Sequence, residues 1–369
     1  HRTVSDRAQT LAPMFWYDHD PYLAIADGRL VWIYDAYTWT DRFPYSEPFW
    51  GDSNVGEINY VRNSVKVTID AYTGETTFYV VDPDDPILQT YQAIFPDLFT
   101  PVTEMDPTVR AHWRYPEQFF RIQADAYASY HMEDPQVFYN KEDLWTTPSE
   151  SYGAREQGRM APYYVVMELP GSSEVEFIMM RPYVPNGREN MIAWLYADSD
   201  GDDYGQLGVY KFSKEELVYG PTQIAARFDQ DAYISQQLTL WNQRGSEVIR
   251  GNLLVIPVDD TLLYVQPLYL QAQAGSIPEL KRVLLAHGSR LVMAEDLATA
   301  LGQVLSDEPV EVPPGEEPLP TDVASLVRSA QAHYEAAERC LQVGDWACYG
   351  RELDALASDL EALVEATEE

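Results

Sequence analysis

A proline-rich acidic segment divides the chain near residue 310, and no other feature restricts the fold as strongly. Residues 306–320 contain five prolines and five acidic side chains and almost nothing to bury. Proline lacks a backbone N–H and fixes φ, so such a segment continues neither a helix nor a central strand. The sequence therefore predicts a linker over residues 306–320, with separately folded parts on either side.

Beyond the linker, apolar side chains recur every three or four residues, as they do on one face of an α-helix. The two series are Val323, Val327, Ala330, Tyr334, Ala337 and Leu341, followed by Trp346, Tyr349, Leu353, Leu356, Leu360 and Leu363. Gly344 suits the left-handed end of the first helix, and Asp345 suits the N-cap of the second. Residues 321–369 are therefore expected to form an antiparallel helical hairpin.

The only two cysteines, Cys340 and Cys348, lie four residues on either side of Gly344. Positions equidistant from the turn of an antiparallel hairpin face one another, so the pair is expected to form a disulfide in an oxidising compartment. The alternative interpretation is that both are small buried side chains.

Before the linker, short runs of β-branched and aromatic residues alternate with turn residues, which indicates strands. Residues 65–69 and 76–81 flank one turn signal, and residues 163–169 and 175–180 flank another, so each pair predicts a β-hairpin. Helices are expected at residues 87–95, 116–130, 232–242, 278–286 and 294–305. The predicted fold class is α+β, with mostly antiparallel β-hairpins, interspersed helices and the C-terminal helical hairpin.

The β-rich part is long enough for two domains. The segment 152–159 has few apolar residues and is the best candidate for a boundary between them. We therefore expect an N-terminal α+β part over residues 1–155 and a second, β-rich α+β part over residues 156–305.

Charge and composition restrict the classes of protein to which the chain can belong. Its 369 residues carry 25 Lys and Arg against 59 Asp and Glu, a net charge of −34. A nucleic acid or an anionic membrane surface would repel this charge, so we expect no nucleic-acid partner. With 46% hydrophobic residues the chain is too apolar for a disordered acidic protein, yet its apolar runs are only strand-length. Because it begins at His1, we expect a processed chain or a part of a longer one.

Four carboxylates crowd around a glycine between two apolar segments: Asp198, Asp200, Asp202 and Asp203. Hard cations prefer oxygen ligands, so this loop is a candidate Ca²⁺ site. It is not an EF-hand, because Asp203 stands where that loop needs glycine and Val209 where it needs a bidentate Glu. The alternative interpretation is a solvated acidic turn.

Aromatic side chains gather among turn residues at positions 39–50: Trp39, Phe43, Tyr45, Phe49 and Trp50. Flat amphipathic rings suit the faces of sugars as well as protein surfaces, so this stretch is a candidate ligand-binding loop. The alternative is that these rings belong to the core and its rim.

No motif of a known catalytic centre stands out. The sequence holds no Gly-x-Ser-x-Gly, no phosphate-binding glycine loop and no histidine pair with zinc-ligand spacing. The run Asp18-His19-Asp20 offers a histidine with two carboxylates, but neighbours in a strand point to opposite faces, which favours a structural role. The acidic run at 82–85 is expected to cap the following helix. With 59 acids, a glycosidase-like carboxylate pair cannot be singled out.

Six long segments together carry a resemblance to a known family. They are residues 27–38 (DGRLVWIYDAYT), 59–74 (NYVRNSVKVTIDAYTG), 134–145 (DPQVFYNKEDLW), 190–205, 233–272 and 278–301. In this order they resemble Uncharacterised Protein Family 0182, over nearly the whole chain. One departure is Gln266, which stands where the family is associated with Glu. That departure weakens any proposal of a catalytic carboxylate at this position.

The resemblance implies an origin in a prokaryotic membrane protein. Members of the family look like proteins with several N-terminal transmembrane helices, a large soluble region, a linker and a C-terminal helical segment. This chain is similar to the soluble portion, so the resemblance implies a place on the extracytoplasmic side of the cell membrane, with the transmembrane region as a partner. It implies no reaction.

The leading hypothesis is a non-catalytic extracytoplasmic domain that binds a ligand or a protein partner in the cell envelope. The alternative is an envelope hydrolase that acts on glycan or peptide. The expected partner in the envelope is a protein or a glycan, and Ca²⁺ is the one cofactor that the sequence suggests.

Overall fold

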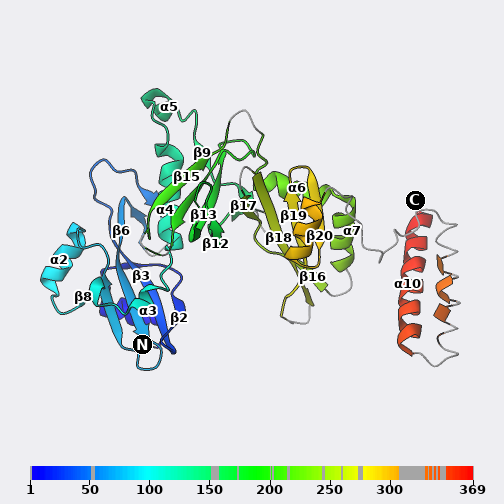
Figure 1. Ribbon diagram of the computed structural model, residues 1–369, viewed down its shortest axis with the longest axis horizontal. Coiled ribbons are helices and arrows are strands. Elements are labelled where there is room, and N and C mark those ends of the chain that lie inside the picture. The colour runs from blue at the N-terminus through cyan, green and yellow to red at the C-terminus, as the bar shows by residue number, and fades with distance from the viewer. Residues whose placement is uncertain are drawn as a thin grey trace. The chain divides into compact units, whose positions relative to one another are not determined.

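The computed structural model divides the chain into two compact units, His1–Asp307 and Glu308–Glu369 (Figure 1). The residues that the structure describes are 2–50, 55–150, 158–172, 174–199, 201, 203–213, 217–242, 246–258, 261–272, 277–306, 329–330, 332–334, 336–337, 340 and 346–368. The predicted linker therefore lies outside the described residues except for Ser306. Each unit is described by itself.

The first unit begins with a sheet that carries helices α1 and α2. Its strand order is β1-β3-β6-β7-β8, β2 pairs with β3 as well, and all neighbours are antiparallel except β7 and β8. The elements are α1 (Val4–Leu11), β1 (Trp16–Tyr17), β2 (Tyr22–Ala26), β3 (Arg29–Thr40), β6 (Tyr60–Asp70), β7 (Thr76–Val80), α2 (Pro86–Ile94) and β8 (Phe99–Pro101). The predicted hairpin over 65–69 and 76–81 is confirmed by the β6–β7 pairing.

A second sheet lies beside a long helix, α4 (Figure 1). Its order is β12-β13-β14-β15, with β9 added to β13, and every pair is antiparallel. The elements are β9 (Trp145–Thr146), β12 (Tyr163–Glu168), β13 (Val175–Pro185), β14 (Ala193–Asp198), β15 (Leu207–Lys211), η1 (Val102–Glu104), α3 (Pro107–Arg110), α4 (Glu117–Tyr130) and α5 (Pro135–Asn140). The predicted hairpin over 163–169 and 175–180 is confirmed by the β12–β13 pairing.

Two short strand pairs border these sheets and supply part of the site described below. They are β4 (Phe49–Trp50) with β5 (Glu57–Ile58), and β10 (Ser149–Glu150) with β11 (Gly158–Arg159).

A third sheet completes the first unit, in the order β16-β18-β19-β20 with β17 also paired to β18. The elements are α6 (Pro221–Gln230), α7 (Ala232–Trp241), β16 (Ser246–Arg250), β17 (Leu254–Val258), β18 (Thr261–Ala272), β19 (Glu279–His287), β20 (Arg290–Ala294) and α8 (Leu297–Leu305). One apolar core joins the second sheet, helices α6 and α7, and the third sheet, with Trp194 and Leu284 among its members. The Tyr163 hydroxyl extends this link, since it donates to Val255 O at 2.8 Å and accepts from Val255 N at 3.0 Å.

The predicted helix over 278–286 is wrong, because these residues form the central strand β19. Leu284 and Ala286 enter the core shared with the second sheet, whereas Val283 and Leu285 enter a separate core that α8 covers. A strand buried on both faces is apolar at successive positions, and its pattern can be mistaken for a helix. The other predicted helices in the first unit are confirmed as α2, α4, α7 and α8, although α8 begins only at Leu297.

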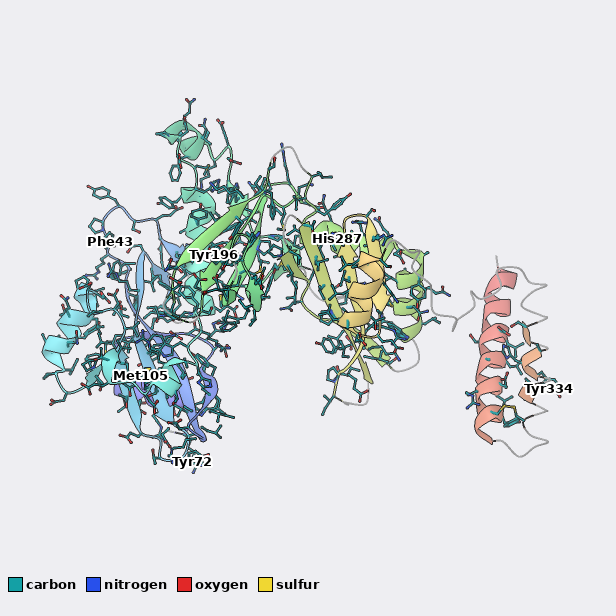
Figure 2. All side chains as sticks on the ribbon, viewed as in Figure 1. Phe43, Tyr72, Met105, Tyr196, His287 and Tyr334 are labelled. Carbon is teal, nitrogen blue, oxygen red and sulfur yellow. A yellow bond between two sulfur atoms is a disulfide. The ribbon has the colours of Figure 1, made fainter. Side chains whose placement is uncertain are left out.

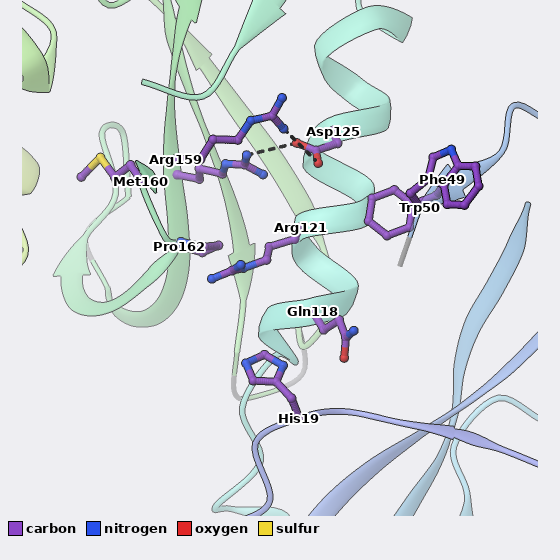
Figure 3. Close-up of a pocket in the computed structure, with 10 residues that line it drawn as sticks. His19, Phe49, Trp50, Gln118, Arg121, Asp125, Arg159, Met160 and Pro162 are labelled. Atoms are coloured by element: carbon purple, nitrogen blue, oxygen red, sulfur yellow. Dashed lines mark hydrogen bonds and ion pairs between the residues drawn. The ribbon is translucent and has the colours of Figure 1, made fainter. Parts of the chain in front are cut away.

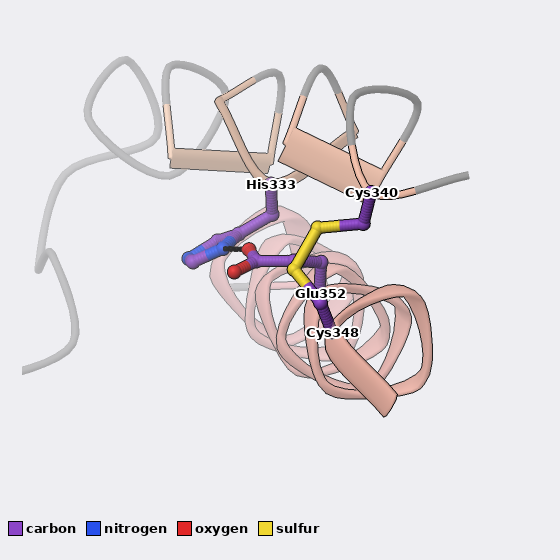
Figure 4. The surroundings of a disulfide bond; sticks show 4 residues. All are labelled: His333, Cys340, Cys348 and Glu352. Carbon is purple, nitrogen blue, oxygen red and sulfur yellow. Dashed lines mark hydrogen bonds and ion pairs between the residues drawn. A yellow bond between two sulfur atoms is a disulfide. The ribbon is translucent and has the colours of Figure 1, made fainter. Parts of the chain in front are cut away.

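The second unit contains the helix α10 (Trp346–Glu368) and, before it, described residues between 329 and 340 that are also helical. A disulfide joins Cys340 to Cys348, whose Cα atoms are 5.7 Å apart, and His333 Nδ1 lies 2.8 Å from a carboxylate oxygen of Glu352 (Figure 4). Cys340 follows His333 in the first segment, whereas its partner Cys348 precedes Glu352 in α10, so the two segments run antiparallel. Gly344 and Asp345 lie outside the described residues.

Candidate functional site

A cavity of about 480 Å³ lies in the first unit where three arginines converge, and we call it the arginine pocket. Its lining comes from the loop after β1, strands β4, β11 and β13, and helix α4 (Figure 3). The lining residues are His19, Phe49, Trp50, Gln118, Arg121, Asp125, Arg159, Met160, Pro162 and Arg181. The volume is within the range of small-molecule sites in proteins.

Helix α4 supplies three of these side chains from one face. Gln118, Arg121 and Asp125 are spaced by three and four residues, so they stand one above the other along the helix. Stacking of Phe119 on Tyr37 of β3, with ring centroids 5.8 Å apart, holds the start of the helix against the first sheet. Farther along the helix, the Tyr183 hydroxyl of β13 donates to Ala124 O at 2.6 Å, which fixes it to the second sheet.

Asp125 is the carboxylate that two of the arginines share. Arg181 Nη2 lies 3.0 Å from one carboxylate oxygen, and Arg159 Nη1 lies 3.7 Å from the other. In Figure 3 the side chain of Arg159 points toward Asp125. The third arginine, Arg121, pairs with Glu117 one turn earlier on the same helix. Each guanidinium is thus held in place by a carboxylate.

Arg181 differs from the other two arginines in its burial, because it lies in the middle of strand β13 and is only 3% exposed. Its Nη2 also donates to the Thr147 hydroxyl, but its Nε and Nη1 have no hydrogen-bond partner in the described part of the chain. Burial lowers the pKa of the Arg181 guanidinium below its usual range. A buried guanidinium with unused donors is costly unless an anion completes it.

The balance of charge in the pocket is opposite to that of the chain. Three guanidinium groups face one carboxylate among the lining residues that the structure describes, whereas the whole chain has 59 acidic against 25 basic side chains. Arginine forks match carboxylate and phosphate oxygens. The pocket is therefore suited to an anionic group, with Phe49, Trp50, Met160 and Pro162 as its apolar walls.

The predicted aromatic loop is only partly used. Phe49 and Trp50 line the pocket, and Trp50 is 74% exposed. Trp39 instead packs against the core cluster of Trp16, Tyr37 and Ile58. Phe43, labelled in Figure 2, stacks on Tyr60 with ring centroids 5.3 Å apart. Tyr45 is fully exposed and lines neither this pocket nor the one discussed below.

The run Asp18-His19-Asp20 divides between two roles. Asp18 is buried and accepts hydrogen bonds from the Tyr37 hydroxyl and from Asp20 N, so it supports the structure. Asp20 pairs with Arg114 at 2.6 Å. His19 is half-exposed and lines the arginine pocket, which the sequence did not indicate.

The acidic run at 82–85 caps a helix, as predicted. The Asp85 carboxylate accepts a hydrogen bond from Ile87 N at 3.0 Å, at the start of α2. Asp85 is also fully buried, and its carboxylate accepts hydrogen bonds from the hydroxyl groups of Thr38 and Ser64.

The predicted calcium loop is described only in part. Asp198 is buried at the end of β14, and Asp203 accepts from the side chain of Gln206. Asp200 and Asp202 lie outside the described residues. Among the residues that are described, no group of three or more His, Cys, Asp or Glu is arranged to hold a metal ion. The calcium site stays a prediction.

Sequence reasoning missed the arginine cluster because its members come from three separate elements. One signal was present, since Arg181 interrupts the apolar run of β13, FIMMRPYV. A charged residue inside a buried strand normally has a specific partner.

Comparison with known proteins agrees with the resemblance noted above. The model of the family described as "Uncharacterised protein family (UPF0182)" matches residues 1–241. The chain belongs to this family. It is 48% identical to a UPF0182 protein of Pelotomaculum thermopropionicum, over 99% of this chain and 40% of the relative. It is 50% identical to one of Cupriavidus necator, over 98% and 40%, and 46% identical to one of Methanospirillum hungatei, over 97% and 40%.

The chain thus spans about 40% of the length of these relatives. No solved structure matches it. Within the described residues, no helix has the length and apolar character needed to cross a membrane.

Proposed function

We propose that this chain is the extracytoplasmic, ligand-binding domain of a longer membrane protein, and that its arginine pocket holds an anionic group of the ligand. The observation that carries the proposal is the convergence of Arg121, Arg159 and the buried Arg181 on one cavity, whose described lining residues include a single carboxylate. An anion in the cavity would balance the charge of the three guanidinium groups and accept hydrogen bonds from those that reach the cavity.

Binding explains the pocket better than hydrolysis does. Glycoside hydrolysis needs two carboxyl groups about 5 to 10 Å apart. Among the described residues that line the arginine pocket, Asp125 is the one carboxylate, and two arginines engage it. A carboxylate held in this way serves to position the guanidinium groups rather than to donate or accept a proton.

The extracytoplasmic location rests on different support. The family resemblance implies a membrane protein with transmembrane helices outside this chain, and the chain spans about 40% of its relatives. The Cys340–Cys348 disulfide suits an oxidising compartment. The partners proposed are the transmembrane region of the same protein and an envelope ligand.

Calorimetric titration with inorganic phosphate and with D-glucuronate tests the binding function. We expect both anions to bind the chain and Arg159→Ala to weaken binding roughly 10- to 100-fold, because a hydrogen bond to a charged group contributes about 1.5–3 kcal/mol. Arg159 is 69% exposed, so its loss should leave the fold intact. Arg188→Ala, an exposed arginine outside the pocket, is the matched control. Equal affinities for Arg159→Ala and Arg188→Ala would refute the proposal.

The location is tested in intact cells that produce the full-length protein. Tyr45 is fully exposed, and both cysteines of this chain are in the disulfide, so Tyr45→Cys adds one accessible thiol to this domain, with labelling of the unaltered full-length protein as the baseline. A membrane-impermeant maleimide should label it before lysis. Labelling only after lysis would place the domain on the other side of the membrane.

A further inference from the structure

A second cavity adjoins the arginine pocket and differs from it in chemistry. It has a volume of about 530 Å³ and shares Phe49 and Asp125 with the arginine pocket. Its other walls come from the loop before β4, the start of β6, and the second half of α4. We call it the aromatic pocket, after the rings of Phe49, Tyr60 and Tyr130 that line it.

The aromatic pocket offers flat rings together with hydrogen-bond acceptors. Glu47 and Asp125 line it beside the three rings, and no Lys, Arg or His is among its described lining residues. The C–H faces of a sugar pack on aromatic rings, and its hydroxyl groups donate to carboxylates. A second anion would meet no cation here. An acyl chain would desolvate the Glu47 carboxylate without giving it a donor, which costs free energy.

We infer that the two cavities together bind an acidic saccharide. Its anionic substituent lies in the arginine pocket, and the neighbouring neutral sugar ring lies in the aromatic pocket. Phe49 and Asp125 stand at the junction, where the glycosidic linkage passes. This inference rests on the proposed function and adds the class of ligand to it.

The anion of such a saccharide can be a carboxylate, as in a uronic acid, or a phosphate ester, since an arginine fork accepts either. Matched pairs of probes distinguish these sources. One pair is D-glucuronate with cellobiouronic acid, and the other is glucose 6-phosphate with trehalose 6-phosphate. Cellobiose and trehalose are the neutral controls.

Calorimetric titration of the chain with these six probes tests the inference. In at least one of the two pairs, we expect the acidic disaccharide to bind roughly tenfold more tightly than its monosaccharide, the upper end of what ring packing contributes. The neutral disaccharides should bind far more weakly than the acidic ones. If neither pair shows a gain from the second ring, the inference is wrong, while the anion site remains. If no acidic probe binds at all, the proposed function itself fails.

Single substitutions distinguish the contributions of the two cavities to binding. Tyr130 is 58% exposed at the end of α4, so Tyr130→Ala should fold normally. It should remove most of the disaccharide's advantage and leave monosaccharide binding unchanged. Tyr139→Ala is the matched control, because Tyr139 is 86% exposed on α5 and lines neither cavity. Arg159→Ala should weaken both probes of a pair alike. An unchanged advantage in Tyr130→Ala would overturn the inference.

Discussion

The first two sheets and the third sheet bury different kinds of side chain. Six charged residues are buried in and around the first two sheets: Asp18, Asp35, Lys66, Asp85, Arg181 and Asp198. In the described residues from 217 to 306, which form the third sheet and its helices, the buried polar side chains are the uncharged Gln237 and Gln266. The third sheet is stabilised by apolar packing. In the first two sheets, the buried charges also carry an unfavourable desolvation free energy.

That cost is offset at most of the six positions. Asp85 accepts four hydrogen bonds, two of them from buried hydroxyl groups, and Lys66 Nζ lies 2.5 Å from Asp35 Oδ1. Arg181 differs, because two of its nitrogens have no partner in the described structure. Charges with complete partners serve the fold, and we propose that Arg181, whose partners are incomplete among the described residues, belongs to a binding site.

Breaking the Lys66–Asp35 pair should have the largest effect. Lys66 is fully buried, its Nζ donates to Arg114 O at 3.3 Å, and it lies over the rings of Trp113 and Tyr204. Lys66→Met should lower the free energy of unfolding by about 3–5 kcal/mol, because it leaves a buried carboxylate without its cation. Urea unfolding measures this change.

The matched control replaces both partners, as Lys66→Met with Asp35→Leu. The double variant should regain most of the lost stability, since a buried pair replaced by apolar side chains is often neutral. A single variant as stable as the natural chain would contradict the view that this pair stabilises the first sheet.

A charge introduced into the third sheet should lower the free energy of unfolding more than a neutral substitution at the same position. Gln266 is 1% exposed, and its Nε2 donates to Gly251 O at 3.1 Å. Gln266→Glu should cost about 1–3 kcal/mol at pH 7, because a carboxylate oxygen would face that carbonyl. Gln266→Met is the control for loss of the hydrogen bond alone.

This penalty should depend on pH. Burial raises the pKa of the introduced carboxyl above its value in the unfolded chain, so the penalty is absent at low pH and grows as pH rises through the folded-state pKa. Unfolding free energies measured between pH 4 and pH 8 would show the slope. A penalty that does not vary with pH would mean that the carboxyl reaches water.

His131, at the C-terminal end of helix α4, should make stability depend on pH in the opposite direction and to a smaller extent. Its ring stacks on Trp145 with centroids 3.6 Å apart, and burial lowers its pKa below the usual 6.5. The unfolded chain therefore binds the proton more readily, and stability should fall as pH drops through about 6.5. His131→Phe keeps a ring and removes the titration, so it should lose less stability between pH 7.5 and pH 5.5. Equal losses would show that His131 does not titrate differently on folding.

Calcium should have the smallest effect on stability. Its addition tests whether the buried Asp198 carboxylate binds a cation. If the loop at 198–203 binds Ca²⁺ with a millimolar dissociation constant, millimolar Ca²⁺ stabilises the chain by about 1 kcal/mol or less. The melting temperature in Ca²⁺ should then exceed that in chelator, and Asp198→Asn should remove the difference. Identical melting temperatures would leave the loop as a solvated turn.

Local signals in the sequence predicted local structure well. The turn before Thr76 and the Pro170-Gly171 turn gave the two hairpins, and Asp85 gave the start of α2. Signals failed where tertiary packing decides the outcome. β19 has apolar side chains on both faces because two different cores cover it, and no local pattern separates that case from a helix.

The site shows the same limit. Phe49 and Trp50 were predicted from their setting among turn residues, and both line the arginine pocket. Arg121, Arg159 and Arg181 come from a helix and two strands, so only the fold brings them together. A sequence shows which charges a chain has, but not which of them will share one carboxylate.

The central claim is that Arg181 is part of an anion site. The most direct test is whether an anion raises the free energy of unfolding only when Arg181 is present. The free energy of unfolding is measured for the natural chain and for Arg181→Met, each with and without saturating D-glucuronate. We predict that the anion stabilises the natural chain and not Arg181→Met, while the two chains without anion differ by less than about 2 kcal/mol, because methionine removes a costly buried charge. Equal stabilisation of both chains by the anion, or of neither, would contradict the claim.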